Sequence, residues 1–204
     1  MSKMPVNRKT HEVLNQPKPY SGVNAYQSDP MLCEVANSMP KALRDEFSAI
    51  GRFVTTPEAQ ELARIANRST PELKTFDPSG HRIDQVDFHP AYHALMRRAF
   101  SNGLHSSIWE NKPLEKGIVH QARGIRFFLT AGLESGHLCP ITMTSASIAS
   151  IKSNPSVART WGPKILSRNY DSSHRPVAKK NGATIGMGMT EKQGGTDVQA
   201  NTST

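Results

Sequence analysis

The residues best suited to bind a ligand lie near the end of the sequence, between Ile185 and Ala200. Apolar residues alternate with glycines there, which is the two-residue period of a β-strand, in the order Ile185, Gly186, Met187, Gly188, Met189. The pair Gly194-Gly195 follows in a polar turn. Because glycine has no Cβ, it lets a ligand approach the main chain closely. The pattern predicts a strand that leads into a ligand-binding loop.

Hydroxyl and carboxylate side chains surround the two glycines. Thr190 and Thr196 stand on either side of them, and each hydroxyl can both donate and accept a hydrogen bond. Asp197 can accept from nearby backbone N–H groups and so hold the loop in shape. These groups suit an anionic or heteroaromatic ligand. The alternative is a plain glycine turn between two strands, and the residues alone leave both interpretations open.

Two common phosphate-binding patterns do not fit this loop. A dinucleotide-binding fingerprint that began at Gly186 and Gly188 would need a third glycine at position 191, where the chain has Glu191. A Walker-type loop would need a Gly-Lys-Ser or Gly-Lys-Thr sequence, and none follows. The ligand chemistry of the loop must therefore be of another kind.

Composition narrows the class of protein. The chain has 204 residues, a formal net charge of +8 and an isoelectric point near 9.7. We expect one or two domains, no transmembrane span and no signal peptide. Cys33 and Cys139 are far apart and lack the spacing of metal ligands, so we interpret both as reduced core thiols of a cytoplasmic protein.

Most of the chain before the loop is expected to be helical. Asp29-Pro30 and Thr56-Pro57 each place a capping side chain before a proline, which predicts two helix starts. Apolar spacing predicts further helices over residues 41–53, 117–137 and 155–166, and another that begins at Cys139. The expected inward side of 117–137 is Ile118, Ala122, Ile125, Phe128, Leu129 and Leu133.

Two clusters of polar residues could indicate catalysis or metal binding, and we favour a simpler interpretation of each. His89 and His93 have the spacing of zinc ligands on a helix, but Pro90 stands where a metalloprotease has its glutamate. We therefore expect His89 to cap a helix that runs to Phe100. Asp171-Ser172-Ser173-His174 lies in a polar connection and lacks the nucleophile elbow of a hydrolase.

Three segments follow from these patterns. Residues 1–29 form an extended N-terminal arm, residues 30–180 a helical domain, and residues 181–204 the start of a β domain with the ligand loop. The arm is either a disordered tail or a segment that crosses to another subunit, which would explain Val13 and Leu14. A lone strand needs a partner, so we expect the chain to be the front of a longer protein or to pair its strand with another chain.

The loop resembles the flavin-binding signature of acyl-CoA dehydrogenases, through Gly188-Met189-Thr190-Glu191 and Gly194-Gly195-Thr196-Asp197 with Ala200 after it. Other short runs resemble the AidB branch of that family: Thr10-His11, Asn15-Gln16-Pro17, Ala66-Asn67, Pro71-Glu72-Leu73, Phe88-His89-Pro90-Ala91 and Cys139 to Thr144. The resemblance implies a mainly α fold, in which an acyl-CoA dehydrogenase-type N-terminal helical domain is followed by the first strand or strands of a truncated β-barrel.

The resemblance also implies a function and a cofactor. It implies an FAD-dependent oxidoreductase on CH–CH donors, a tetramer, and a link to the protection of DNA from alkylation. The flavin contacts would be Met187, Gly188, Met189, Thr190, Gly194, Gly195 and Thr196. In the family, the catalytic glutamate, the second flavin-contacting strand and the DNA-binding part all lie beyond the position that corresponds to residue 204. We therefore assign this chain no catalytic residue.

Three functions remain open from the sequence. The chain could belong to a flavin-dependent dehydrogenase of acyl thioesters, to a flavoprotein that protects double-stranded DNA, or to a helical docking and oligomerisation module without activity of its own. The positive charge favours DNA only weakly, because the basic residues are spread along the chain and accompany no recognition motif.

Overall fold

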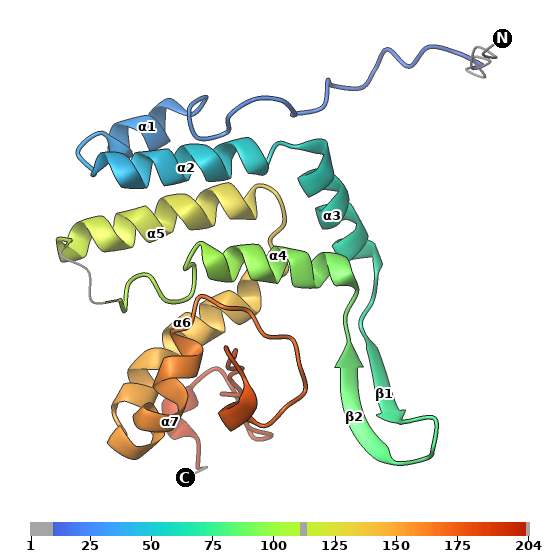
Figure 1. Cartoon of the computed structure of the whole chain (residues 1–204), viewed down its shortest axis with the longest axis vertical. Coiled ribbons are helices and arrows are strands. Elements are labelled where there is room, and N and C mark those ends of the chain that lie inside the picture. The colour runs from blue at the N-terminus through green and yellow to red at the C-terminus, as the bar shows by residue number, and fades with distance from the viewer. Residues whose placement is uncertain (1–9, 111–113, 203–204) are drawn as a thin grey trace.

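The computed structural model describes residues 10–110 and 114–202, and in these ranges it is mainly helical (Figure 1). The helices are α1 (Pro30–Ala36), α2 (Lys41–Phe53), α3 (Pro57–Arg68), α4 (Pro90–Ser101), α5 (Lys116–Ala131), α6 (Leu138–Lys152) and α7 (Pro155–Ile165). Two short 3-10 turns, η1 (Val177–Lys179) and η2 (Val198–Ala200), lie in the C-terminal part. None of the described helices has the length and apolar character needed to cross a bilayer.

The side chains expected to start three helices do so. Asp29 Oδ1 accepts a hydrogen bond from Leu32 N at 3.1 Å. Thr56 Oγ1 accepts from Ala59 N at the same distance. His89 Nδ1 accepts from Ala91 N at 3.1 Å, which confirms that His89 caps α4. A capping side chain satisfies a backbone donor that the first turn of a helix leaves unpaired, so these starts are encoded locally.

A β-hairpin between α3 and α4 was not expected. Strands β1 (Glu72–Phe76) and β2 (Arg82–Asp87) pair antiparallel around the turn at Asp77–Gly80. The residues Asp77-Pro78-Ser79-Gly80 form a typical turn sequence. The strands escaped detection because their side chains are mostly exposed and their apolar residues do not alternate clearly. Figure 1 shows the hairpin extending away from the helices.

The core consists of three packed clusters. The first joins α1, α2 and α5 around Phe47, Ile50 and Ile125. The second joins α4 and α6 around Phe100 and Ile141. The third packs Ile148 of α6 and Ile165 of α7 against the connection to the ligand loop, and its other buried or half-buried members are Ala183, Trp109, Ile151, Trp161, Leu166 and Ile185. The helical body therefore holds the first residues of the C-terminal segment in its own core.

Three expectations about the helical part are wrong. Helix α5 ends at Ala131 rather than at His137, because the Glu134 carboxylate bonds to the backbone N–H groups of Gly136 (2.6 Å) and His137 (3.0 Å) and shapes a turn before α6. Phe128 was expected to face inward, yet 62% of it is exposed. Cys139 is exposed rather than a core thiol, whereas Cys33 is half-buried.

The strand expected over Ile185 to Met189 is also absent. This segment is extended but belongs to no ladder, and the only pairing near it is an isolated bridge between Glu191 and Gly194. A strand is stabilised by backbone hydrogen bonds to a neighbouring strand, and no described segment forms such a ladder with this one. The division of the chain at residue 180 stays a prediction.

Candidate flavin-binding loop

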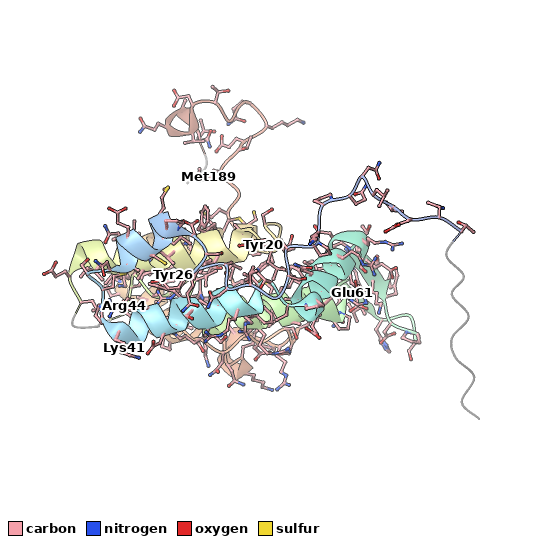
Figure 2. The ribbon with its side chains drawn as sticks, turned by 90° about the horizontal axis from the view of Figure 1, so that it is seen from above. Tyr20, Tyr26, Lys41, Arg44, Glu61 and Met189 are labelled. Atoms are coloured by element: carbon pink, nitrogen blue, oxygen red, sulfur yellow. The ribbon has the colours of Figure 1, made fainter. Side chains whose placement is uncertain are left out.

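The predicted ligand loop stands clear of the helical body. Figure 2 shows the chain leaving the helices near Met189 and the following residues forming a separate lobe. Met187 is 44% exposed and Met189 is 56% exposed, although both side chains are apolar. These two side chains are therefore accessible to a ligand or to another segment.

A small set of hydrogen bonds shapes the loop from within. Glu191 and Gly194 exchange backbone hydrogen bonds of 3.0 and 3.1 Å, which closes the turn. The Glu191 carboxylate accepts from Thr202 N at 3.0 Å, and the Asn201 side chain donates to Met189 O at 2.6 Å. Asp197 accepts from Gln199 N at 3.2 Å, which confirms that Asp197 stabilises its own loop. The end of the described chain thus folds back onto the loop.

The two adjacent glycines have different roles. A Cβ added at Gly195 would lie 2.6 Å from Thr190 Cγ2, so glycine is needed there for Thr190 to pack across the turn. A Cβ added at Gly194, Gly186 or Gly188 would meet nothing within 4 Å. Packing inside this chain therefore does not require glycine at those three positions. The open space beside them is compatible with a flat ligand that approaches the main chain.

The structure brings some of the predicted site residues together and leaves others apart. Thr190 and Gly195 are in contact across the turn, and Gly194 lies beside them. Met187, Gly188 and Met189 precede them along the extended segment, and Thr196 is exposed on the far side of the turn. In the described part of the chain, no hydrogen bond engages the backbone N–H groups of residues 187–190. These donors are available to a ligand.

The root of the loop is tied to the helical body. Ile185 N donates to Thr144 Oγ1 of α6 at 3.1 Å, and that hydroxyl donates to Pro140 O at 2.7 Å. Ala183 N donates to Lys164 O of α7 at 3.1 Å, and the Lys164 ammonium donates to Lys180 O at 2.5 Å. The loop therefore projects from a fixed base rather than from a free linker.

Close packing adds to these bonds at Gly182. A Cβ there would come within 1.9 Å of Asn169 O, so only glycine fits. Sequence reasoning missed Thr144, Lys164 and Gly182. Thr144 entered the sequence analysis only as the end of the run from Cys139 to Thr144, and the sequence does not indicate which segment its hydroxyl contacts.

The connection that precedes the loop is held by several polar contacts. Tyr170 shares a hydrogen bond of 2.8 Å with His93 Nδ1 of α4, and burial raises the pKa of the Tyr170 phenol. His105 Nε2 donates to Ser167 O at 2.9 Å. The Arg168 guanidinium binds the Glu110 carboxylate through contacts of 2.7 and 3.0 Å.

Asp171 organises the middle of this connection. Its carboxylate accepts from the Ser173 hydroxyl at 2.6 Å, from Ser173 N at 3.0 Å and from Asn181 N at 2.9 Å. These hydrogen bonds stabilise the ionised form and lower the pKa of Asp171. The bonds explain the Asp171–His174 cluster as a structural feature of the connection.

The loop's donor set fits the pyrimidine edge of a flavin. That edge carries two carbonyl oxygens and a ring nitrogen that accept hydrogen bonds and one ring N–H that donates, and the loop offers backbone N–H groups and the Thr190 hydroxyl, which can do either. The glycines at 186, 188 and 194 leave space for a planar ring to approach. These features are compatible with one face of a cofactor site.

Comparison with known proteins places the chain in a family. Residues 15–172 match the family described as the adaptive response protein AidB N-terminal domain. The chain is 44% identical over 195 residues to AidB of Escherichia coli (strain K12), a protein classed with the acyl-CoA dehydrogenases. It is 28% identical over 182 residues to acyl-CoA dehydrogenase family member 11 of Caenorhabditis elegans.

These matches cover 95% and 86% of this chain, but only 36% and 28% of the two relatives. The chain thus spans about a third of the length of the curated relatives that it matches.

Solved structures share the fold. The apo form of Bd2924 superposes with a TM-score of 0.76 at 22% identity, over 93% of this chain and 37% of that one. Caenorhabditis elegans ACDH-11, solved in complex with C11-CoA, superposes with a TM-score of 0.73 at 21% identity, over 100% of this chain and 34% of that one. At sequence identities this low, the two superpositions show a shared fold only. They confirm the expected acyl-CoA dehydrogenase-type N-terminal helical domain. Together with the match over residues 15–172, they show that the chain belongs to the AidB family and forms the N-terminal portion of an AidB-like protein.

Proposed function

We propose that this chain supplies one side of the FAD site of an acyl-CoA dehydrogenase-like flavoprotein that acts on CH–CH donors. The observation that carries the proposal is the exposed loop of residues 187–196, which presents backbone donors and a hydroxyl from a fixed base. Membership of the AidB family supports the flavin as the ligand of that loop. The acyl substrate stays open.

Different residues of the loop would contact different parts of the flavin. The backbone N–H groups of Met187 and Met189 and the Thr190 hydroxyl would meet the pyrimidine edge of the isoalloxazine ring. Gly188, Gly194 and Gly195 would let the main chain lie close to the ring, and Thr196 would reach the phosphate side. When bound, FAD supplies the hydride acceptor of the dehydrogenation. Donors aimed at the pyrimidine edge stabilise the negative charge that develops there during hydride transfer.

The family link also supports wider proposals about the complete protein. It would work as a homo-oligomer, a tetramer by resemblance, in the cytoplasm and in the response to DNA alkylation. The catalytic base and most of the DNA contacts would come from residues beyond those described here. The competing proposal is that the helical body serves only for docking and oligomerisation.

Titration of FAD into the complete protein and its Thr190→Val variant tests the flavin proposal. Loss of one hydrogen bond to a charged flavin should weaken binding by roughly 1.5–3 kcal/mol. Thr184→Val is a matched control, because Thr184 is exposed but lies before the loop. Equal FAD affinities of all three proteins would remove Thr190 from the site. A complete protein that binds no FAD would refute the flavin function itself.

A further inference from the structure

A large groove on the helical body lies far along the chain from the flavin loop. It has a volume of about 880 Å³ and is formed by the segment before α1 and the start of that helix, by α3, by the residues that follow α2, and by the end of α5 with the turn after it. Its apolar lining includes Ala63, Leu129 and Leu133, and the exposed side chains of Met31 (74%) and Phe128 (62%) border it. Phe128 belongs to the apolar stripe of α5, so its exposure indicates an occupant that this chain's described residues do not provide.

The N-terminal arm joins the helical body at Tyr20, at the edge of this groove. Tyr20 lines the groove and is held there, since its carbonyl accepts from Gln60 Nε2 at 2.7 Å and its hydroxyl bonds to Ser28 Oγ at 3.0 Å. The residues before Tyr20 leave the body, as Figures 1 and 2 show. Residues 10–20 are all exposed, and Val13 (58%) and Leu14 (82%) expose apolar side chains.

The arm is poorly suited to fold back into its own groove. Pro17 and Pro19 hold their own φ angles and restrict Gln16 and Lys18 to extended conformations. A reversal between Leu14 and Tyr20 would have to occur within this stiff stretch. The same stiffness lowers the entropy that the arm loses when it binds to another molecule in an extended form.

The arm and the groove each carry one acidic and one basic side chain that could pair with the other. Glu12 precedes the apolar pair Val13-Leu14, and Lys18 follows it. The groove is lined by Arg64 and Asp29 in addition to its apolar residues. Arg64 donates to Glu61 through Nε and Nη2, and Nη1 donates no hydrogen bond within the described residues, so it can accommodate a second carboxylate.

We infer that the groove binds the Glu12–Leu14 segment of a second copy of this chain, in a reciprocal exchange of arms. Leu14 fills the apolar part beside Phe128, and Glu12 approaches Arg64. Each arm leaves its own helical body at the rim of the groove. In a two-fold dimer whose grooves face each other, the point where each arm leaves its body would therefore lie opposite the groove of the other copy. Residues 10–19 span about 30 Å when extended, which is sufficient to cross between two facing bodies. The inference rests on the homo-oligomer of the proposed function and identifies one of its contacts.

Sedimentation of the 204-residue chain over a range of concentrations tests the exchange. We expect wild-type chain to self-associate and Leu14→Asp to weaken the association by roughly tenfold or more, because a charge replaces a buried leucine. Leu73→Asp is the matched control, since Leu73 is 65% exposed on β1 and distant from the groove. A monomeric wild type, or equal association of Leu14→Asp and wild type, would overturn the inference. FAD binding by the complete protein is measured separately, so failure here leaves the flavin function standing.

Cross-linking identifies the occupant. Chains that carry Leu14→Cys and chains that carry Phe128→Cys, with different tags and with Cys33→Ala and Cys139→Ala in both, are mixed and treated with a short bismaleimide. We expect a product that joins the two tags, and none when Leu73→Cys replaces Leu14→Cys. In a chain with both cysteines, a cross-link within one chain and none between chains would show that the arm occupies its own groove, and would refute the exchange.

Discussion

Thr144 of α6 and Ile185 are joined by a hydrogen bond across 41 residues, from the Ile185 backbone N–H to Thr144 Oγ1 at 3.1 Å. This bond marks the point where the chain leaves the hydrophobic core and becomes the exposed loop. Before it, Ala183 is buried; after it, Met187 and Met189 are exposed. The orientation of the candidate flavin loop therefore depends on a helix in the body as well as on the loop's own residues.

The first prediction concerns this bond. Thr144→Val keeps the shape of the side chain but leaves the Ile185 N–H without its partner, which should favour local opening by about 1–3 kcal/mol. Hydrogen exchange of residues 185–190 should become faster, while the helices keep their protection. Thr142→Val is the control, because Thr142 is exposed on the same helix. Unchanged exchange in Thr144→Val would show that other contacts suffice to hold the loop.

The second prediction is that the 204-residue chain alone does not retain FAD. It supplies one exposed loop, and a site with a single side neither excludes water nor fixes the orientation of a flavin. The purified chain should be colourless, and after incubation with FAD and dialysis into FAD-free buffer it should show no flavin absorbance. A yellow protein with near-stoichiometric flavin would mean that the chain forms a complete site.

The third prediction concerns the ion pair that links α2 to α5. Arg126 is almost fully buried and donates to Glu46 at 2.7 and 2.9 Å. Glu46→Ala would leave this charge without its carboxylate, so the free energy of unfolding should fall by about 3 kcal/mol. Asp45→Ala removes an exposed pair with Lys41 and should cost less than about 1 kcal/mol. Denaturant titrations measure both, and similar losses would contradict the assignment of Arg126–Glu46 as a buried structural pair.

The fourth prediction concerns pH. The His105 ring is buried against Phe100, with 4.0 Å between the ring centroids, and this burial lowers the pKa of His105 to about 4. Between pH 4 and about 6.5, the unfolded chain binds a proton at this residue and the folded chain does not. The contribution of His105 to stability is therefore complete above pH 6.5 and falls as the pH decreases toward 4.

Comparison with His105→Gln isolates this contribution. Relative to the variant, wild type should lose roughly 2–3 kcal/mol between pH 7 and pH 4. Glutamine retains an N–H that can donate to Ser167 O, so the two proteins differ mainly in the titrating ring. Parallel pH profiles from denaturant titrations would show that folding does not lower the pKa of His105.

The fifth prediction is that this chain binds duplex DNA weakly and without sequence preference. Several basic side chains are already paired, including Arg64, Lys74, Arg82, Arg126 and Arg168. Lys179 and Lys180 are adjacent basic residues in the connection before the loop, and the Lys180 ammonium donates to Ser173 O at 2.6 Å. Each phosphate engaged adds a slope of about −0.9 in log K against log salt, so fluorescence anisotropy should give a shallow slope. Tight binding with a steep slope would place the DNA function in the helical body.

Much of the local structure could be predicted from the sequence. The starts of α1, α3 and α4 depend on Asp29, Thr56 and His89, each of which bonds to a backbone N–H two or three residues ahead. These signals involve only residues that are neighbours in the chain, so they can be identified from the sequence. The loop motif was recognised for a similar reason, since its glycines and hydroxyls are contiguous.

Only the tertiary structure decided which side chains are buried and which distant segments contact each other. It exposed Phe128 at a groove although the residue lies in an apolar stripe, and it left Ile185 to Met189 extended without a strand partner. It also joined Thr144 to Ile185 and Arg126 to Glu46, which the sequence separates by 41 and 80 residues. Burial and long-range hydrogen bonds depend on which segments become neighbours after folding, and the periodicity of one segment does not contain that information.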